Sequence, residues 1–206
     1  MPLFKELNIL FIHIPKTGGT SVEKYFFSKI GLYDQWINNR NNDVCKEYLF
    51  GKHNNSNERF QHMTIDRIKS YTGNDLSDYK IYSIVRNPYH RLISDLLYLK
   101  MININSTPEE VEKNIKVYLE SEIYNNHKLQ QYKFITNDKV IVRGLRMMRT
   151  ETLTDCMRAN GFIDFDVKIN ISNEKNIDYM TMYTEKAKQQ VLEYYIDDFN
   201  IFGYDK

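Results

Sequence analysis

The segment that most constrains the fold is an apolar run followed at once by a short loop rich in glycine and hydroxyl groups. Residues 8–14 read NILFIHI and stop at Pro15, a pattern typical of a buried strand. The loop PKTGGTS covers residues 15–21, and apolar residues then recur at helical spacing as far as Ile30. A strand, a tight loop and a helix in this order predict an open α/β sheet with the loop at the carboxyl end of the strand.

Two later segments repeat the pattern of a strand followed by a helix. Residues 79–85, YKIYSIV, predict a second buried strand, and Pro88 suits the first turn of the helix after it. Residues 140–148 look extended, and residues 151–160 predict a helix that stops at Gly161. We therefore predict an α/β fold in which helices flank a central parallel sheet.

The chain as a whole predicts one domain over residues 1–206. The 206 residues fit a single core, 16 Tyr and 11 Phe can fill it, and no linker interrupts the sequence. The net charge of +1 gives no global field that would attract nucleic acid or an anionic membrane. A local site must therefore hold any anionic ligand.

Neither a membrane segment nor a metal site is visible in the sequence. The N-terminus lacks a basic region followed by a long apolar run, so we expect no membrane span and a cytoplasmic location. The two cysteines, Cys45 and Cys156, have no metal-ligand spacing, and a disulfide between them is possible but not needed.

The loop at residues 15–21 suits a phosphate group. The first turn of a helix offers unpaired N–H groups and the positive end of a dipole, and Gly18 and Gly19 allow close approach of the backbone. Thr20 and Ser21 add hydroxyl groups, and Lys16 adds a mobile cation. The alternative is a plain glycine turn with a solvated lysine. The loop is not the nucleotide-kinase motif GxxxxGK[ST], because its lysine precedes the glycines.

The string HIPKTGGTS resembles the 5′-phosphosulfate loop of sulfotransferases, above all the carbohydrate type that includes the heparan sulfate 2-O- and 6-O-sulfotransferases. The resemblance implies a P-loop-like nucleotide-binding fold and 3′-phosphoadenosine 5′-phosphosulfate (PAPS) as the donor. It also implies a hydroxyl-bearing acceptor, expected to be a glycan, and no requirement for metal. The residues it assigns to donor binding are Lys16, Thr17, Gly18, Gly19, Thr20 and Ser21.

Residues 81–100, IYSIVRNPYHRLISDLLYLK, resemble the element of the same family that binds the 3′-phosphate. The resemblance assigns this phosphate to Arg86, at the strand end, and Ser94, in the helix. Arginine offers a planar, permanently charged fork for phosphate oxygens. Two helical turns span ~11 Å, so the helix must fold back over the strand end. The alternative is that Arg86 pairs with a surface acid and that Ser94 is a polar residue without a role in binding.

Two weaker matches extend the resemblance along the chain. RTETLTD at residues 149–155 resembles a family stretch to which we assign no ligand role, and EYYIDDFNIFGYD at residues 193–205 indicates core packing.

Transfer of a sulfuryl group needs stabilisation of the leaving phosphate and removal of a proton from the acceptor hydroxyl. Lys16 suits the first role, and a histidine suits the second because imidazole titrates near neutral pH. We favour His62, since QHMTIDRI at residues 61–68 resembles a family segment whose histidine is the proposed base. The stretch before it is irregular, so Glu58 is the reserve, and His53 stays open.

The other histidines are weaker candidates for the base. His13 lies beside the loop and is expected to pack there or orient it, whereas His90 is expected to face solvent. His127 lies in a polar stretch, NNHKLQQ, where Gln130 or Gln131 could touch substrate.

Two other classes of function stay open from the sequence. A phosphotransferase of the nucleotide-kinase kind would need a magnesium-holding acid at a strand end, but Pro15 and Arg86 follow the first two strands. A non-catalytic nucleotide-binding module would keep the loop and lack transfer activity. Side chains that could face an acidic glycan are Lys46, Lys52, Arg59 and Lys128.

Overall fold

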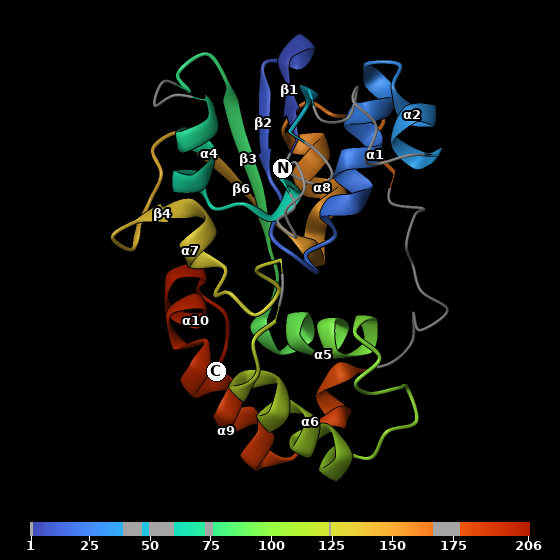
Figure 1. Cartoon of the computed structure of the whole chain (residues 1–206), viewed down its shortest axis with the longest axis vertical. Coiled ribbons are helices and arrows are strands. Elements are labelled where there is room, and N and C mark those ends of the chain that lie inside the picture. The colour runs from blue at the N-terminus through green and yellow to red at the C-terminus, as the bar shows by residue number, and fades with distance from the viewer. Residues whose placement is uncertain (1, 39–46, 50–59, 73–75, 124, 167–177) are drawn as a thin grey trace.

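The computed structural model describes residues 2–38, 47–49, 60–72, 76–123, 125–166 and 178–206 (Figure 1). Its strands are β1 (Leu3–Phe4), β2 (Ile9–Ile12), β3 (Lys80–Val85), β4 (Thr136–Asn137), β5 (Val140–Ile141) and β6 (Leu145–Arg149). Its α-helices are α1 (Gly19–Lys29), α2 (Tyr33–Asn38), α4 (Ile65–Thr72), α5 (Pro88–Tyr98), α6 (Pro108–Glu120), α7 (Tyr132–Ile135), α8 (Leu153–Ala159), α9 (Glu185–Tyr194) and α10 (Ile196–Phe202). Short 3₁₀ turns are η1 (Lys5–Leu7), η2 (Phe60–His62), η3 (Thr150–Thr152) and η4 (Tyr179–Met182).

The central sheet has four strands in the order β1-β2-β3-β6. Strands β2, β3 and β6 are parallel, with Ile12 beside Ser83 and Val85 beside Arg149, whereas β1 runs antiparallel to β2. The predicted α/β fold is confirmed. Because β2, β3 and β6 are parallel, their carboxyl ends lie at the same edge of the sheet. Sequence reasoning missed β1, which is only two residues long.

Alternating side chains along the strands build a core on each face of the sheet, as expected for strands buried on both sides. On one face, Phe11 and Tyr82 pack with residues of α1 and α8. On the other, Leu10 and Ile12 pack with residues of α4, α7 and α10. In Figure 1, α1 and α8 accordingly lie on the opposite side of the strands from α4.

A third cluster lies below the carboxyl ends of the strands, where Figure 1 places α5, α6 and α9. Its buried residues include Leu96 of α5, Ile115 of α6 and Val191 of α9. Helix α5 follows β3 directly and crosses under the sheet, so it brings its side chains to the same edge as the loop after β2.

Several helices begin directly after a threonine, a residue type that favours helix starts. Thr107 accepts a hydrogen bond from the backbone N–H of Glu110, whose carboxylate accepts one from the backbone N–H of Thr107, a full capping box. Thr184 caps α9 by accepting from the N–H of Ala187, and Thr64 precedes α4. These local bonds fix the helix starts independently of tertiary packing.

Two predicted elements were wrong in their extent. Residues 140–148 are not one strand: β5 pairs with β4 as a hairpin, and Gly144, with φ +82°, separates it from β6. Only glycine adopts that backbone readily, and it cannot continue a strand. The spacing of apolar residues after Thr184 predicts a single helix, but the segment forms two, because Tyr195 leaves the helical conformation between α9 and α10.

None of the helices in the described part of the chain is long and apolar enough to span a membrane.

Candidate active site

The loop between β2 and α1 turns through two residues in the left-handed region. Lys16 has φ +65° and Gly18 has φ +86°, and Gly18 is the residue that precedes α1. Alternation of left- and right-handed residues curls successive N–H groups toward one point, which creates a concavity for an anion. The loop therefore has the backbone shape of an anion-binding concavity.

The side chains of three residues outside the loop hold the carbonyl groups of this loop. The carbonyl of Pro15 accepts from Arg91 Nε at 3.0 Å, that of Lys16 from Arg86 Nη1 at 3.2 Å, and that of Thr17 from Thr150 Oγ1 at 2.7 Å. In a trans peptide the C=O of one residue and the N–H of the next point in opposite directions. The N–H groups of residues 16–18 are thus turned away from these side chains, toward the open side of the loop.

The hydroxyl-bearing residues of the loop differ in where they lie. Thr17 is fully buried, and its Oγ1 donates to the carbonyl of Ile14 at 2.9 Å, so this hydroxyl is committed to the loop itself. Ser21 is buried and Thr20 is half-buried in the first turn of α1. Of the three, only Thr20 keeps substantial side-chain exposure.

Gly19 is required by the imidazole ring of His13. A Cβ added at Gly19 would lie 2.2 Å from that ring. The ring cannot easily yield, because His13 Nδ1 lies 2.5 Å from a carboxylate oxygen of buried Glu23, on the next turn of α1. His13 therefore packs against the loop and fixes its position, as the sequence analysis expected.

Arg86 lies at the loop, whereas Ser94 lies farther along α5. The Arg86 guanidinium sits over the ring of Tyr179, 5.7 Å from its centroid, in addition to its bond to Lys16. Burial lowers the pKa of Arg86, which still leaves a guanidinium charged at neutral pH. Ser94 is half-buried, and no hydrogen bond joins it to Arg86 in the described part of the chain.

Lys16 itself reaches toward the end of α5. Its Nζ lies 4.2 Å from the centroid of the Tyr98 ring. The Lys16 ammonium thus lies at the end of the helix that carries Ser94.

His62 is buried at the centre of a cluster of three histidines. Its ring centroid lies 4.7 Å from that of His13 and 5.4 Å from that of His127, and each of the three side chains is nine-tenths or more buried. His62 Nδ1 is 3.0 Å from the carbonyl oxygen of His13. Because a carbonyl only accepts, Nδ1 carries the proton, and the lone pair of neutral His62 lies on Nε2.

The surroundings of His62 keep its ring neutral. Burial, assisted by the neighbouring His13 and His127, holds the pKa of His62 well below 6.5. A neutral imidazole, with its lone pair on Nε2, is the form that can accept a proton.

His127 has a buried carboxylate partner. His127 Nδ1 lies 2.6 Å from one oxygen of Asp95, and the other oxygen accepts from the hydroxyl of Tyr118 at 2.7 Å. Burial alone would raise the pKa of Asp95, but the bonds from His127 and Tyr118 outweigh it and the pKa is lowered. Asp95 is therefore a carboxylate that holds His127 in one orientation.

Sequence reasoning missed the buried charges that organise this cluster. Arg91 and Asp95 stand four residues apart among Leu92, Ile93 and Leu96 of α5, and Glu23 faces inward from α1. Charged residues on an otherwise apolar helix face were the available signal, since such residues are rarely buried without a partner. His90, expected to face solvent, is half-buried, and burial lowers its pKa.

Glu58, His53 and Cys45, together with Lys46, Lys52 and Arg59, lie outside the described residues. Cys156 is a free thiol, with Sγ 3.4 Å from Thr152 Oγ1.

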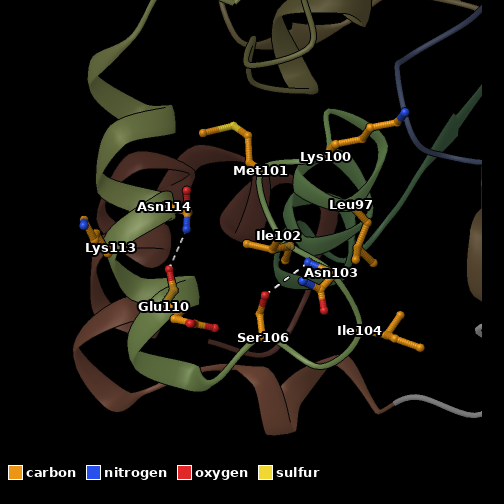
Figure 2. A pocket seen from close by; sticks show the side chains of 10 residues that line it. All are labelled: Leu97, Lys100, Met101, Ile102, Asn103, Ile104, Ser106, Glu110, Lys113 and Asn114. Carbon is orange, nitrogen blue, oxygen red and sulfur yellow. Dashed lines mark hydrogen bonds between the residues drawn. The ribbon is translucent and has the colours of Figure 1, made fainter.

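A hollow of about 800 Å³ lies at the junction of α5 and α6 (Figure 2). Glu110 and Asn114 of α6 face it from one side, and Leu97 and Lys100, which flank Tyr98 in sequence, face it from the other. The remaining lining residues are Met101, Ile102, Asn103, Ile104, Ser106 and Lys113. The hollow thus combines amide, hydroxyl and charged groups with a few apolar ones.

Residues 3–140 of the chain match the sulfotransferase family. Together with the sheet, this match defines a P-loop-like α/β fold. The chain belongs to the sulfotransferase family, which includes carbohydrate sulfotransferases such as the heparan sulfate O-sulfotransferases. It is accordingly a sulfotransferase family enzyme, and the family implies PAPS as the donor. No curated protein and no solved structure gave a significant match.

Proposed function

We propose that this enzyme transfers the sulfuryl group of PAPS in line to a carbohydrate hydroxyl, with Lys16 and His62 as the catalytic residues. The observation that carries the proposal is the loop at residues 15–21, whose carbonyls are tied back by Arg86, Arg91 and Thr150. The 5′-phosphate lies on the opposite side, on the N–H groups of residues 16–19. Thr20 and Ser21 complete this part of the donor site, and Arg86 and Ser94 bind the 3′-phosphate.

Each catalytic residue has one role. Lys16 places its charge at the oxygen that bridges sulfur and phosphorus, where negative charge grows as the S–O bond breaks. His62 Nε2 takes the proton of the acceptor hydroxyl as its oxygen attacks sulfur. The hydrogen bond from His62 Nδ1 to the carbonyl of His13 supports this role, because it fixes the tautomer that leaves Nε2 as the acceptor.

The hollow at the junction of α5 and α6 supports a glycan as the acceptor. Asn103, Ser106 and Asn114 offer neutral hydrogen-bonding groups, and Lys100, Lys113 and Glu110 offer charges of both signs. A hydroxyl-rich sugar matches that combination better than a phenol or a lipid, which would require a mainly apolar pocket.

The test is a transfer assay with radiolabelled PAPS over a panel of sugars, phenols and lipids, in the presence and absence of EDTA. We expect sulfate on a sugar hydroxyl and no loss of activity with EDTA. Calorimetry should show binding of 3′-phosphoadenosine 5′-phosphate. Binding of ATP with magnesium in its place, or transfer that requires added magnesium, would contradict the proposal.

A further inference from the structure

Tyr98 combines high exposure with two defined contacts in the candidate site. Its side chain is 61% exposed, at the last residue of α5. Nonetheless its ring stacks on that of His127, with an interplanar angle of 10° and 5.5 Å between the ring centroids. Lys16 Nζ lies 4.2 Å from the centroid of the Tyr98 ring. An exposed tyrosine with no role would be free to sample several rotamers.

The ring beneath Tyr98 is fixed by buried bonds. His127 Nδ1 is bonded to Asp95, and the carbonyl of His127 accepts from Arg91 Nη2 at 2.6 Å. Arg91 in turn holds the phosphate loop through the carbonyl of Pro15. One set of contacts on α5 therefore locates both the loop and the surface against which Tyr98 stacks.

The contact with Lys16 is attractive for an electrostatic reason. The face of an aromatic ring carries partial negative charge, which draws an ammonium group placed over it. A lysine side chain is long and loses much rotamer freedom when a ligand fixes it. A ring that already holds the ammonium beside the loop removes part of that loss before the ligand arrives.

We propose that Tyr98, stacked on His127, is a positioning residue that orders Lys16 for the 5′-phosphate of the donor. The inference rests on the proposed role of Lys16 at the donor. It assigns Tyr98 no contact with the reacting atoms, and its effect passes entirely through Lys16.

The test is a double-mutant cycle on binding of 3′-phosphoadenosine 5′-phosphate, followed by calorimetry. The proteins are the wild type, Tyr98→Leu, Lys16→Ala and the double variant. We expect Tyr98→Leu to weaken binding by about 3- to 10-fold, and to have no further effect once Lys16 is alanine. Tyr98→Phe keeps the aromatic face and should restore binding to the wild-type value.

Tyr71 provides a matched control. It lies on α4, is also exposed, and carries the guanidinium of Arg67 5.2 Å from its ring centroid. Tyr71→Leu should leave nucleotide binding unchanged, and thermal unfolding should show that Tyr98→Leu is folded.

The outcomes separate the inference from the function on which it rests. If Lys16→Ala binds the nucleotide as well as the wild type, the donor role of Lys16 is wrong, and the role of Tyr98 falls with it. If Lys16→Ala weakens binding but Tyr98→Leu does not, or does so equally in both backgrounds, only the inference is overturned. Tighter binding by Tyr98→Leu would also overturn it, because the ring would then be holding the lysine away from the donor.

Discussion

The loop at residues 15–21 and the cluster of His13, His62 and His127 lie side by side, yet they are built in opposite ways. The loop is one continuous segment whose backbone N–H groups turn away from the side chains that hold its carbonyls. The cluster consists of buried side chains from three distant segments, two of them bonded to buried carboxylates.

The difference separates two tasks. A backbone loop binds an anion through many N–H groups, so no one side chain carries all of the binding. A proton acceptor depends on one lone pair and on the charges around it, so its side chains must be fixed and shielded from water. Variants in the two regions should therefore fail in different ways.

The largest effect is expected for Lys16→Ala. Removing one preorganised charge from the leaving group typically costs ~2.7–4 kcal/mol, so kcat should fall by about 10²- to 10³-fold, and donor binding should weaken as well. Single-turnover transfer and calorimetry measure the two effects. Lys24→Ala is the control, because Lys24 also lies over a tyrosine ring, that of Tyr33, but outside the loop. If donor binding weakens while the single-turnover rate is unchanged, Lys16 does not stabilise the transition state.

The next effect is expected for His62→Ala. Loss of a general base should lower kcat by about 10²-fold while 3′-phosphoadenosine 5′-phosphate binds with near wild-type affinity. The wild-type rate should rise with pH below 6.5, since the pKa of His62 is lowered, and the variant should lose that rise. If His62→Ala stays active while Glu58→Ala or His53→Ala is inactive, the base lies in that neighbouring segment instead.

Arg86→Ala should discriminate between nucleotides. A charge-assisted hydrogen bond is worth ~1.5–3 kcal/mol, so binding of 3′-phosphoadenosine 5′-phosphate should weaken by about 10- to 100-fold. Binding of adenosine 5′-phosphate should weaken less, through the lost bond from Arg86 to the carbonyl of Lys16 alone. Equal losses for the two nucleotides, measured by calorimetry, would show that Arg86 supports the loop and does not bind the 3′-phosphate.

The smallest effect is expected in the pH dependence of stability. Folded His62 stays neutral below pH 6.5, whereas the unfolded chain binds a proton there, so acid favours unfolding. The free energy of unfolding should therefore fall between pH 6.5 and 5.5 by up to about 1 kcal/mol more in the wild type than in His62→Gln. Urea titrations at a series of pH values measure how the free energy of unfolding of each protein depends on pH. An equal pH dependence of the free energy of unfolding in the two proteins would mean that His62 binds its proton over the same pH range folded and unfolded.

The donor loop could be predicted from the sequence because its determinants are local. The strand, the loop and the helix start of α1 follow one another directly, and the glycines mark the turn. The position of α5 under the loop could not be predicted, since it depends on the bonds from Arg86 and Arg91 to carbonyls some seventy residues earlier.

The histidine cluster shows the same limit more sharply. His62 and His13 were each singled out, but nothing local indicates that His127 joins them or that Asp95 holds it. The pairing of Asp95 with His127 spans 32 residues and is made by the packing of α5 against the segment before α7. Side-chain pairs of this kind follow from tertiary packing, which periodicity along one element does not encode.

Because His13 approaches Gly19 closely and is bonded to Glu23, a substitution at one of these three positions requires changes at the others. An alanine at position 19 would need a smaller residue at position 13, because the imidazole ring fills the space where its Cβ would go. A smaller residue at position 13 would in turn leave the Glu23 carboxylate without its hydrogen-bond partner, since this carboxylate is 1% exposed and bonded to the His13 ring. A buried carboxylate without a partner is costly, so position 23 would have to become neutral as well. Relatives that lack the second glycine of the loop should therefore differ at all three positions together, and a redesign of the loop should change them in a single step.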